Sequence, residues 1–259
     1  MDSQTNTCRR EGIQVLFACE HLTKCYEGVP TVRDISLSLP EGGLISLLGP
    51  SGVGKTTLLN MLAGVDRPDE GRVLLAGEDI TGIAGRVSYM LQKDLLLEYR
   101  TVLDNVILPL IIRRMPRQEA QEHASAFFYR FGLSGYEHKY PYQISGGMRQ
   151  RAALLRTYLM GNPVILLDEP FSALDAITKL SMHDWYVSIA AEMKLSTLFI
   201  THDIDEAIKL SDTIYILTGK PGVISQIIEI ASTRPRGKGF QTSQEFSGYK
   251  QQIFNALGI

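Results

Sequence analysis

Apolar positions along the chain follow two spacings, one typical of strands and the other of helices. Short apolar runs, or apolar positions alternating with polar ones, predict strands at residues 13–22, 32–39, 44–48, 86–91, 164–167, 196–200, 213–217 and 223–230. The segment 66–82 has the pattern of turn, strand and turn. A spacing near 3.6 residues predicts helices at residues 55–63, 103–112, 116–132, 147–158, 176–193 and 204–210. Strands that alternate with helices are typical of an α/β core.

A mainly helical block at residues 93–160 interrupts this core, and we interpret it as an inserted lobe within a single domain that spans residues 13–230. The run 103–112 is apolar around most of its helical circumference, so we expect it to be well buried. Residues 1–12 and 231–259 are expected to be tails. We interpret the basic residues of the second tail as a solvated surface; they are Arg234, Arg236 and Lys238.

Composition narrows the classes of protein that fit. With 259 residues, 44% of them hydrophobic, the chain can build a sizeable core. A formal charge of -2 argues against a protein that coats nucleic acid, so no nucleic-acid partner is expected. Three cysteines without Cys-x-x-Cys spacing favour a reducing, cytoplasmic setting; they are Cys8, Cys19 and Cys25. The polar N-terminus resembles no secretory signal, and every apolar run is shorter than the ~20 residues of a membrane helix.

The most specific chemical motif is GPSGVGKTT, which follows the apolar strand at 44–48 and opens a helix. Gly49 and Gly54 flank four residues and precede Lys55 and Thr56, a full match to G-x-x-x-x-G-K-[ST]. The glycines let backbone N–H groups curl around phosphate oxygens. Lys55 should then reach the β- and γ-phosphates, and the Thr56 hydroxyl should coordinate Mg²⁺. The expected phosphate-binding residues are Gly49, Pro50, Ser51, Gly52, Val53, Gly54, Lys55, Thr56 and Thr57.

Two adjacent carboxylates, Asp168 and Glu169, follow the apolar strand at 164–167. Paired carboxylates at the end of a buried strand are costly unless they meet a metal ion or a reacting proton. We therefore expect Mg²⁺ between Thr56 and Asp168, and Glu169 as the general base for a water that attacks the γ-phosphate. No Asn-Lys-x-Asp sequence is present to read guanine, so ATP is favoured over GTP.

Three further polar or aromatic residues lie near this chemistry. Gln92 ends the strand at 86–91 and is either an ordinary surface residue or an amide directed at the metal or the attacking water. Tyr26 is either edge packing or a platform for a purine ring. His202 follows a strand that comes one crossover after the carboxylate strand, so both strand ends should face one crevice. We expect His202 to contact the γ-phosphate.

A second helix N-terminus suited to an anion begins at Ser145, where SGGMRQR opens the helix at 147–158. This turn belongs to the inserted lobe, which makes it a poor candidate for the pocket that holds its own chain's phosphates. A head-to-tail homodimer resolves the conflict, because each chain can then place Ser145 and Gly147 on the other's γ-phosphate. ATP would hold this dimer together and hydrolysis would release it.

Together these motifs resemble the six motifs of ABC-transporter ATPase subunits. They run in order through GPSGVGKT, Gln92, ISGGMRQR, VILLDEP, SALD and the histidine of THD. The resemblance implies a P-loop NTPase (RecA-like) core with an N-terminal antiparallel β subdomain and an inserted α-helical subdomain. It also implies adenine stacking on Tyr26, a place for Gln92 beside Mg²⁺, Glu169 as the base and His202 as the switch. The residues expected to contact the partner's ATP are Ser145, Gly146, Gly147 and Asp175.

The resemblance further implies that ATP hydrolysis energises import of a small solute. The partners would be a separate membrane permease and a substrate-binding protein, with the subunit peripheral on the inner face of the cell membrane. SGGMRQR and FSALDA are similar to the nitrate, sulfonate, taurine and bicarbonate importer group, and QKDLLLEYRTVLDN to members that import pyrimidine precursors of thiamine. The alternative is a soluble ABC-type ATPase not coupled to transport. Such chains usually carry long coiled coils or tandem cassettes, and this sequence has one cassette and no heptads.

Overall fold

The structure is a computed structural model that describes residues 14–237 and 239–259. The tail expected at residues 1–12, together with Cys8 and Lys238, lies outside the described residues.

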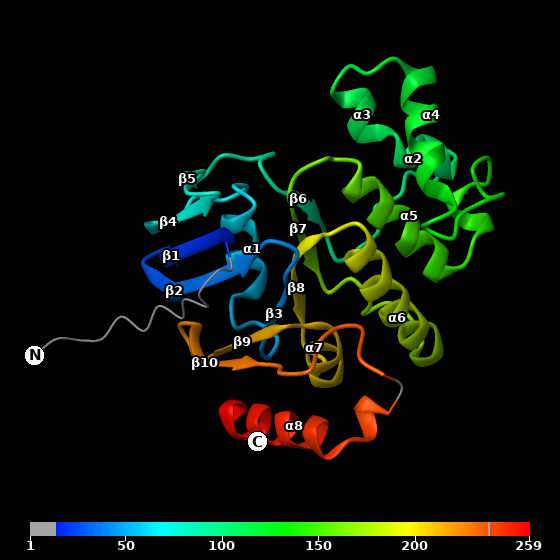
Figure 1. The fold of residues 1–259 in the computed structure, drawn as a ribbon. Helices are drawn as coiled ribbons and strands as arrows, with labels where there is room; N and C mark the ends of the chain where they lie inside the picture. Colours follow the sequence, from blue (N-terminus) through cyan, green and yellow to red (C-terminus); the bar gives the residue numbers. More distant parts are fainter. Residues whose placement is uncertain (1–13, 238) are drawn as a thin grey trace, which may run out of the picture.

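Two sheets make up the β-structure (Figure 1). A four-stranded antiparallel sheet has the order β2-β1-β4-β5. Its strands are β1 (Val15–Tyr26), β2 (Val29–Pro40), β4 (Glu70–Leu75) and β5 (Glu78–Asp79). A six-stranded sheet has the order β10-β9-β3-β8-β7-β6, parallel except for the edge strand β10. Its strands are β3 (Leu44–Leu48), β6 (Ser88–Met90), β7 (Val164–Asp168), β8 (Ser196–Thr201), β9 (Thr213–Thr218) and β10 (Val223–Glu229).

The strands that carry the chemistry lie at the centre of the parallel sheet. Every residue of β3, β7 and β8 is buried, which is the reason that these segments read as continuous apolar runs. The register pairs Leu48 with Thr201, and Asp168 with Ile200. The carboxyl ends of all three strands therefore meet at one edge of the sheet. The predicted phosphate loop follows β3, the two carboxylates stand at the end of β7, and His202 follows β8, so all of them lie at this edge.

The helices divide into groups with different places in the fold. They are α1 (Lys55–Leu62), α2 (Val102–Val106), α3 (Leu108–Ile112), α4 (Arg117–Phe128), α5 (Gly146–Tyr158), α6 (Ala176–Glu192), α7 (Ile204–Leu210) and α8 (Gln244–Leu257). Two short 3₁₀ turns are η1 (Pro141–Gln143) and η2 (Phe240–Thr242). Figure 1 shows α2, α3 and α4 (green) at the opposite end of the molecule from the four-stranded sheet (blue to cyan). Helices α2 to α5 fall within residues 93–160, where the insertion is expected.

Buried side chains form separate cores beneath these groups. One core joins helices α2 to α6 to the parallel sheet. A second joins the four-stranded sheet and α1 to that sheet, and a third joins α7 and α8 to β9 and β10. The two lobes thus rest on different apolar contacts and share the central sheet.

The helix expected at 103–112 is not continuous, although most of the segment is buried as expected. The structure has two short helices, α2 and α3, that meet at Ile107. Pro109 has no N–H to donate into the ladder, so the first helix ends and a new one begins around it. Ile112 at the end of α3 is 78% exposed rather than buried.

The interpretation of the C-terminal basic residues as a solvated surface is also wrong for two of them. Arg234 forms an ion pair of 2.6 Å with Asp212 and keeps 11% of its side chain exposed. The Arg236 guanidinium donates to the carbonyls of Ile208, Lys209 and Ser211 at 2.7–3.0 Å, and so satisfies acceptors at the C-terminal end of α7. Burial lowers the pKa of Arg236 to about 10. The segment expected as a tail is therefore packed, and its helix α8 buries Phe246 and Ile253.

We expect Arg236→Ala to lower the free energy of unfolding by about 2 kcal/mol, because it leaves several part-buried carbonyls without a donor. Urea unfolding followed by circular dichroism measures this loss. Arg72→Ala is the control: Arg72 pairs with Glu20 at 2.7 Å but is 57% exposed, so the stability should change by less than ~0.5 kcal/mol. Equal losses in the two variants would contradict the role of Arg236.

Candidate active site

The glycine loop between β3 and α1 is packed tightly against two neighbouring strands. A Cβ atom on Gly54 would lie 2.5 Å from a methyl carbon of Val32 in β2, and one on Gly49 would lie 2.4 Å from the Leu217 carbonyl oxygen in β9. Gly52 and Gly54 have φ angles of 78° and 104°, which favour glycine. The sequence pattern thus corresponds to a loop that larger residues could not form.

Lys55 lies inside this loop. Its ammonium group donates to the carbonyl oxygens of Gly49 at 2.7 Å and of Pro50 at 2.9 Å. Burial lowers the pKa of Lys55, although the charges of Glu169 and Asp168 act in the opposite direction. A lysine held among carbonyls with little water is well placed to exchange those contacts for the oxygens of an anion.

Asp168 and Thr56 bring two oxygens together at the mouth of the loop. Asp168 is the last residue of β7, and its Oδ2 lies 3.5 Å from the Thr56 hydroxyl in the first turn of α1. Burial, and then the negative charge of Glu169, raises the pKa of Asp168 above its usual value. Neighbouring oxygens on Mg²⁺ lie ~3 Å apart, given bonds of ~2.1 Å in an octahedron. The donor types and their spacing fit such an ion.

Two other predicted site residues, Gln92 and His202, contact the side chain of Glu169. Its Oε2 accepts from the Gln92 amide at 3.2 Å and lies 3.1 Å from Nδ1 of His202. Its backbone N–H donates to the Ile200 carbonyl of β8 at 3.1 Å, and its φ of 44° is unusual for a residue other than glycine. The strand ends therefore bring together Gln92, Glu169 and His202 from three separate parts of the sequence.

Tyr26 lies at the end of β1, near the start of α1. Its hydroxyl donates to Asp66 at 2.6 Å, and the Lys24 ammonium lies 5.5 Å from the ring centroid. The pKa of the Tyr26 hydroxyl is raised, first by this bond to Asp66, while the Thr57 hydroxyl acts to lower it. The residue is 46% exposed, so a ring face is open to a planar ligand. Its role as a purine platform stays a prediction.

The Ser145 turn is placed apart from these residues. Ser145 caps α5 by accepting from the Met148 N–H at 3.3 Å, and α5 packs against α2, α3, α6 and β6. Asp175 caps α6 by accepting from the N–H groups of Ile177 and Thr178. The first turns of the two helices adjoin, since a Cβ on Gly147 would lie 3.0 Å from the Thr178 methyl group. They line an open cleft of about 320 Å³ in the helical lobe.

Several polar residues around the site were not identified from the sequence. The Lys179 ammonium joins Asp203 at 2.6 Å and Glu206 at 3.1 Å, and Asp203 directly follows His202. Gln150 donates its side-chain amide to the carbonyl oxygen of Pro170, next to Glu169. Asp203 and Glu206 lie at the start of α7, a usual place for acidic residues, but nothing local in the sequence predicts the Lys179 contact or the Gln150 bond.

Comparison with known proteins gives consistent matches. Residues 32–172 match the family model described as ABC transporter. The chain is 40% identical to an uncharacterized ABC transporter ATP-binding protein of Methanocaldococcus jannaschii, covering 99% of this chain and 97% of that protein. It is 41% identical to the formylaminopyrimidine import ATP-binding protein ThiZ of Halalkalibacterium halodurans, over 81% and 82% of the two chains. It is 38% identical to the aliphatic sulfonates import ATP-binding protein SsuB 1 of Rhodococcus jostii, over 90% and 89%.

The fold is similar to that of solved dimeric cassettes. One is a post-hydrolysis state of an ATP-binding cassette with ADP and Pi, at a TM-score of 0.72 and 27% identity, covering 84% of this chain and 100% of that one. Another dimeric cassette structure, of a bacterial ABC transporter, matches with the same values. These likenesses confirm the predicted α/β P-loop fold class. In the described part of the chain, no helix combines the length and the apolar character that crossing a bilayer requires.

We expect Asp168→Asn to raise the free energy of unfolding of the nucleotide-free protein at pH 7. The pKa of Asp168 is higher in the folded chain than its ordinary value of 3.8, so the fold disfavours the charged form. That cost is absent below the unfolded pKa and grows to its full size as the pH rises through the folded pKa. The gain from asparagine should therefore shrink as the pH falls from 7 toward 3.

Urea unfolding of both proteins at several pH values measures this difference. A variant that is less stable than the parent at pH 7, or a gain that does not depend on pH, would contradict the assignment of a desolvated carboxylate.

Proposed function

The chain belongs to the ABC transporter family of ATP-binding proteins, and from this membership we propose that it drives import of a small solute through a separate membrane permease. The chain is an ATPase. The observation that carries the assignment of its site is the meeting of Gln92, Glu169 and His202 beside the Thr56–Asp168 pair, at the edge of the sheet where the glycine loop begins.

The proposed chemistry is transfer of the γ-phosphoryl group of ATP to water. The glycine loop and Lys55 hold the phosphates, and Tyr26 stacks on the adenine ring. Thr56, Asp168 and the Gln92 amide oxygen would hold Mg²⁺, which neutralises charge on the phosphate oxygens. Glu169 accepts the proton of the attacking water, and His202 donates to the γ-phosphate. The 3.1 Å contact between His202 and Glu169 supports the proposal that both side chains act on the same phosphate.

We propose that two chains complete each other's sites in a head-to-tail homodimer. The Ser145 turn and the glycine loop begin helices that rest on different cores, since the buried residues of α5 belong to one core and those of α1 to another. The γ-phosphate of an ATP bound by the partner chain would be the anion at the first turn of α5. Its expected contacts in the partner's site are made by Ser145, Gly146, Gly147 and Asp175. The solved cassettes that share the fold are dimeric, which supports a dimer of this chain.

The proposed partners in the membrane are permease subunits, together with a substrate-binding protein that presents the solute. Two relatives are named as import ATP-binding proteins, one for formylaminopyrimidine and one for aliphatic sulfonates. The cargoes named for them differ in chemistry, so the proposal extends to a small solute and not to one compound. The subunit would work on the cytoplasmic face of the cell membrane, where ATP is available.

Glu169→Gln should keep ATP binding and trap the dimer, because the composite site forms but no base takes the proton. Light scattering after gel filtration with ATP should give twice the chain mass, and ATP turnover should fall about a hundredfold or more. The matched control adds Lys55→Ala, which removes the phosphate contact and should leave monomers. Monomers in the Glu169→Gln variant at saturating ATP would refute the composite sites.

The importer assignment is tested by purifying the tagged full chain from detergent-solubilised membranes of its own cells. We expect a membrane protein with several spanning helices to remain bound in a fixed ratio through gel filtration, and urea-washed membranes to rebind the chain. A chain found only in the soluble fraction, with ATP and with ADP, would instead support the soluble ATPase.

A further inference from the structure

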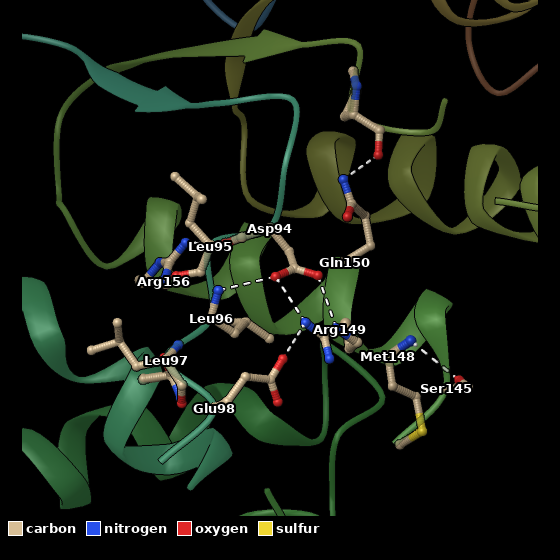
Figure 2. A network of polar contacts seen from close by, with 12 residues as sticks. Asp94, Leu95, Leu96, Leu97, Glu98, Ser145, Met148, Arg149, Gln150 and Arg156 are labelled. Atoms are coloured by element: carbon tan, nitrogen blue, oxygen red, sulfur yellow. Dashed lines mark hydrogen bonds and ion pairs between the residues drawn. The ribbon is translucent and has the colours of Figure 1, made fainter. Parts of the chain in front are cut away.

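Arg149 joins α5 to the segment that follows Gln92 (Figure 2). Its Nε donates to Asp94 Oδ2 at 2.9 Å, and its Nη2 lies 3.3 Å from Asp94 Oδ1. The same Nη2 donates to Glu98 at 2.8 Å. One planar guanidinium thus holds two carboxylates of one segment, a geometry that fixes direction as well as distance.

Other contacts hold the same segment, residues 94–98, against the helical lobe. Arg156, two turns further along α5, donates to the backbone carbonyls of Asp94 and Leu95. Leu96 is 6% exposed in the core of the lobe. The buried Asn105 of α2 accepts from the Leu97 N–H at 2.6 Å and donates back to the Leu97 carbonyl at 3.1 Å. The segment therefore moves with α5 and α2.

Gln92 lies on a short stretch between this segment and the sheet. Met90 ends β6 and is 3% exposed, and the three residues that follow it are all exposed; they are Leu91, Gln92 and Lys93. With few contacts of their own, these residues take their position from the two ends that hold them. The Gln92 amide therefore reaches Glu169 only when β6 and the segment 94–98 keep their positions relative to each other.

Helix α5 is connected to both partners of that contact. Arg149 holds the segment after Gln92, while the adjacent Gln150 bonds to the Pro170 carbonyl just after Glu169. The same helix begins at the Ser145 turn, four residues before Arg149. If the Ser145 turn moved and α5 moved with it, both segments that α5 contacts would shift. The position of Gln92 relative to Glu169 would then change.

We propose that Arg149 is a positioning residue whose ion pair with Asp94 couples engagement of the Ser145 turn by the partner's nucleotide to the alignment of Gln92 at Glu169 in its own site. This inference rests on the proposed dimer. The side chains of Arg149 and Asp94 are only 26% and 21% exposed, so the pair is less screened by water than a surface ion pair. Lysine has no planar fork and would hold a single carboxylate.

The test measures steady-state ATP hydrolysis by the full chain, the affinity of the isolated chain for ATP, and its thermal unfolding. Arg149→Met should lower kcat about tenfold or more and leave the affinity of the isolated chain for ATP within about twofold, because the glycine loop and Tyr26 are untouched. Arg149→Lys should recover part of kcat. Asp94→Asn should match Arg149→Met, and the double variant should lose no more than either single one.

Arg117→Ala is the matched control in the same lobe. Arg117 pairs with Asp104 at 2.7 Å, against 2.9 Å for Arg149 and Asp94, and this pair joins α4 to α2 without involving α5. It should leave kcat unchanged. Equal kcat values for Arg149→Met and Arg117→Ala would overturn the coupling, and so would additive losses in the double variant. A melting temperature lowered in Arg149→Met but not in Arg149→Lys, with kcat following stability alone, would also overturn it.

A second readout separates this inference from the proposed function. In the Glu169→Gln background, adding Arg149→Met should weaken ATP-driven dimerisation about tenfold by light scattering. If the Glu169→Gln parent fails to dimerise, the composite sites fail, and the coupling fails with them. If the parent dimerises and the variant does so equally well, only the coupling is refuted.

Discussion

The rest of the structure depends on holding two carboxylates at the end of a strand that water does not reach. Charge is costly there, and the raised pKa of Asp168 reflects that cost. Neighbouring elements supply polar groups that offset this cost: Thr56 from the first turn of α1, Gln92 after β6 and His202 after β8. Because β3, β7 and β8 are parallel and buried on both faces, their carboxyl ends meet at one edge. A ligand that brings a metal cation would neutralise the charge of the two carboxylates at this edge.

Division of the protein into lobes follows from its separate apolar cores. The four-stranded sheet and α1 rest on one core, and helices α2 to α6 rest on another. The lobes are therefore joined by the central sheet and by polar contacts at its edge, of which Gln92 to Glu169 and Gln150 to Pro170 are two. Polar contacts of this kind are directional and tolerate small displacements poorly. The connection between the lobes is thus sensitive to the state of the site.

Much of the fold follows from the sequence, because buried parallel strands and motif glycines have strong local signals. The predicted bounds of β3 and α7 match the structure. The glycine loop was predicted from its motif, and the carboxylates and His202 from their places at strand ends; the structure brings all of them to one edge of the sheet. One prediction was wrong for a local reason, because the apolar pattern of 103–112 was given more weight than Pro109 within it. Another was wrong because tertiary packing decides: Arg234 and Arg236 find partners within the fold. Arg149 and Asp94 lie 55 residues apart, so no local pattern indicates their pairing.

The left-handed backbone conformation of Glu169 makes certain substitutions at this position favourable for stability. With φ at 44°, a glutamate is strained where glycine or asparagine would rest easily. Glycine or asparagine at this position would relax the backbone and also remove the carboxylate, so the resulting chain is expected to be more stable and less active. Screens that reward thermal robustness or expression alone would enrich such substitutions, so an engineered descendant of this protein has to be selected for turnover at the same time.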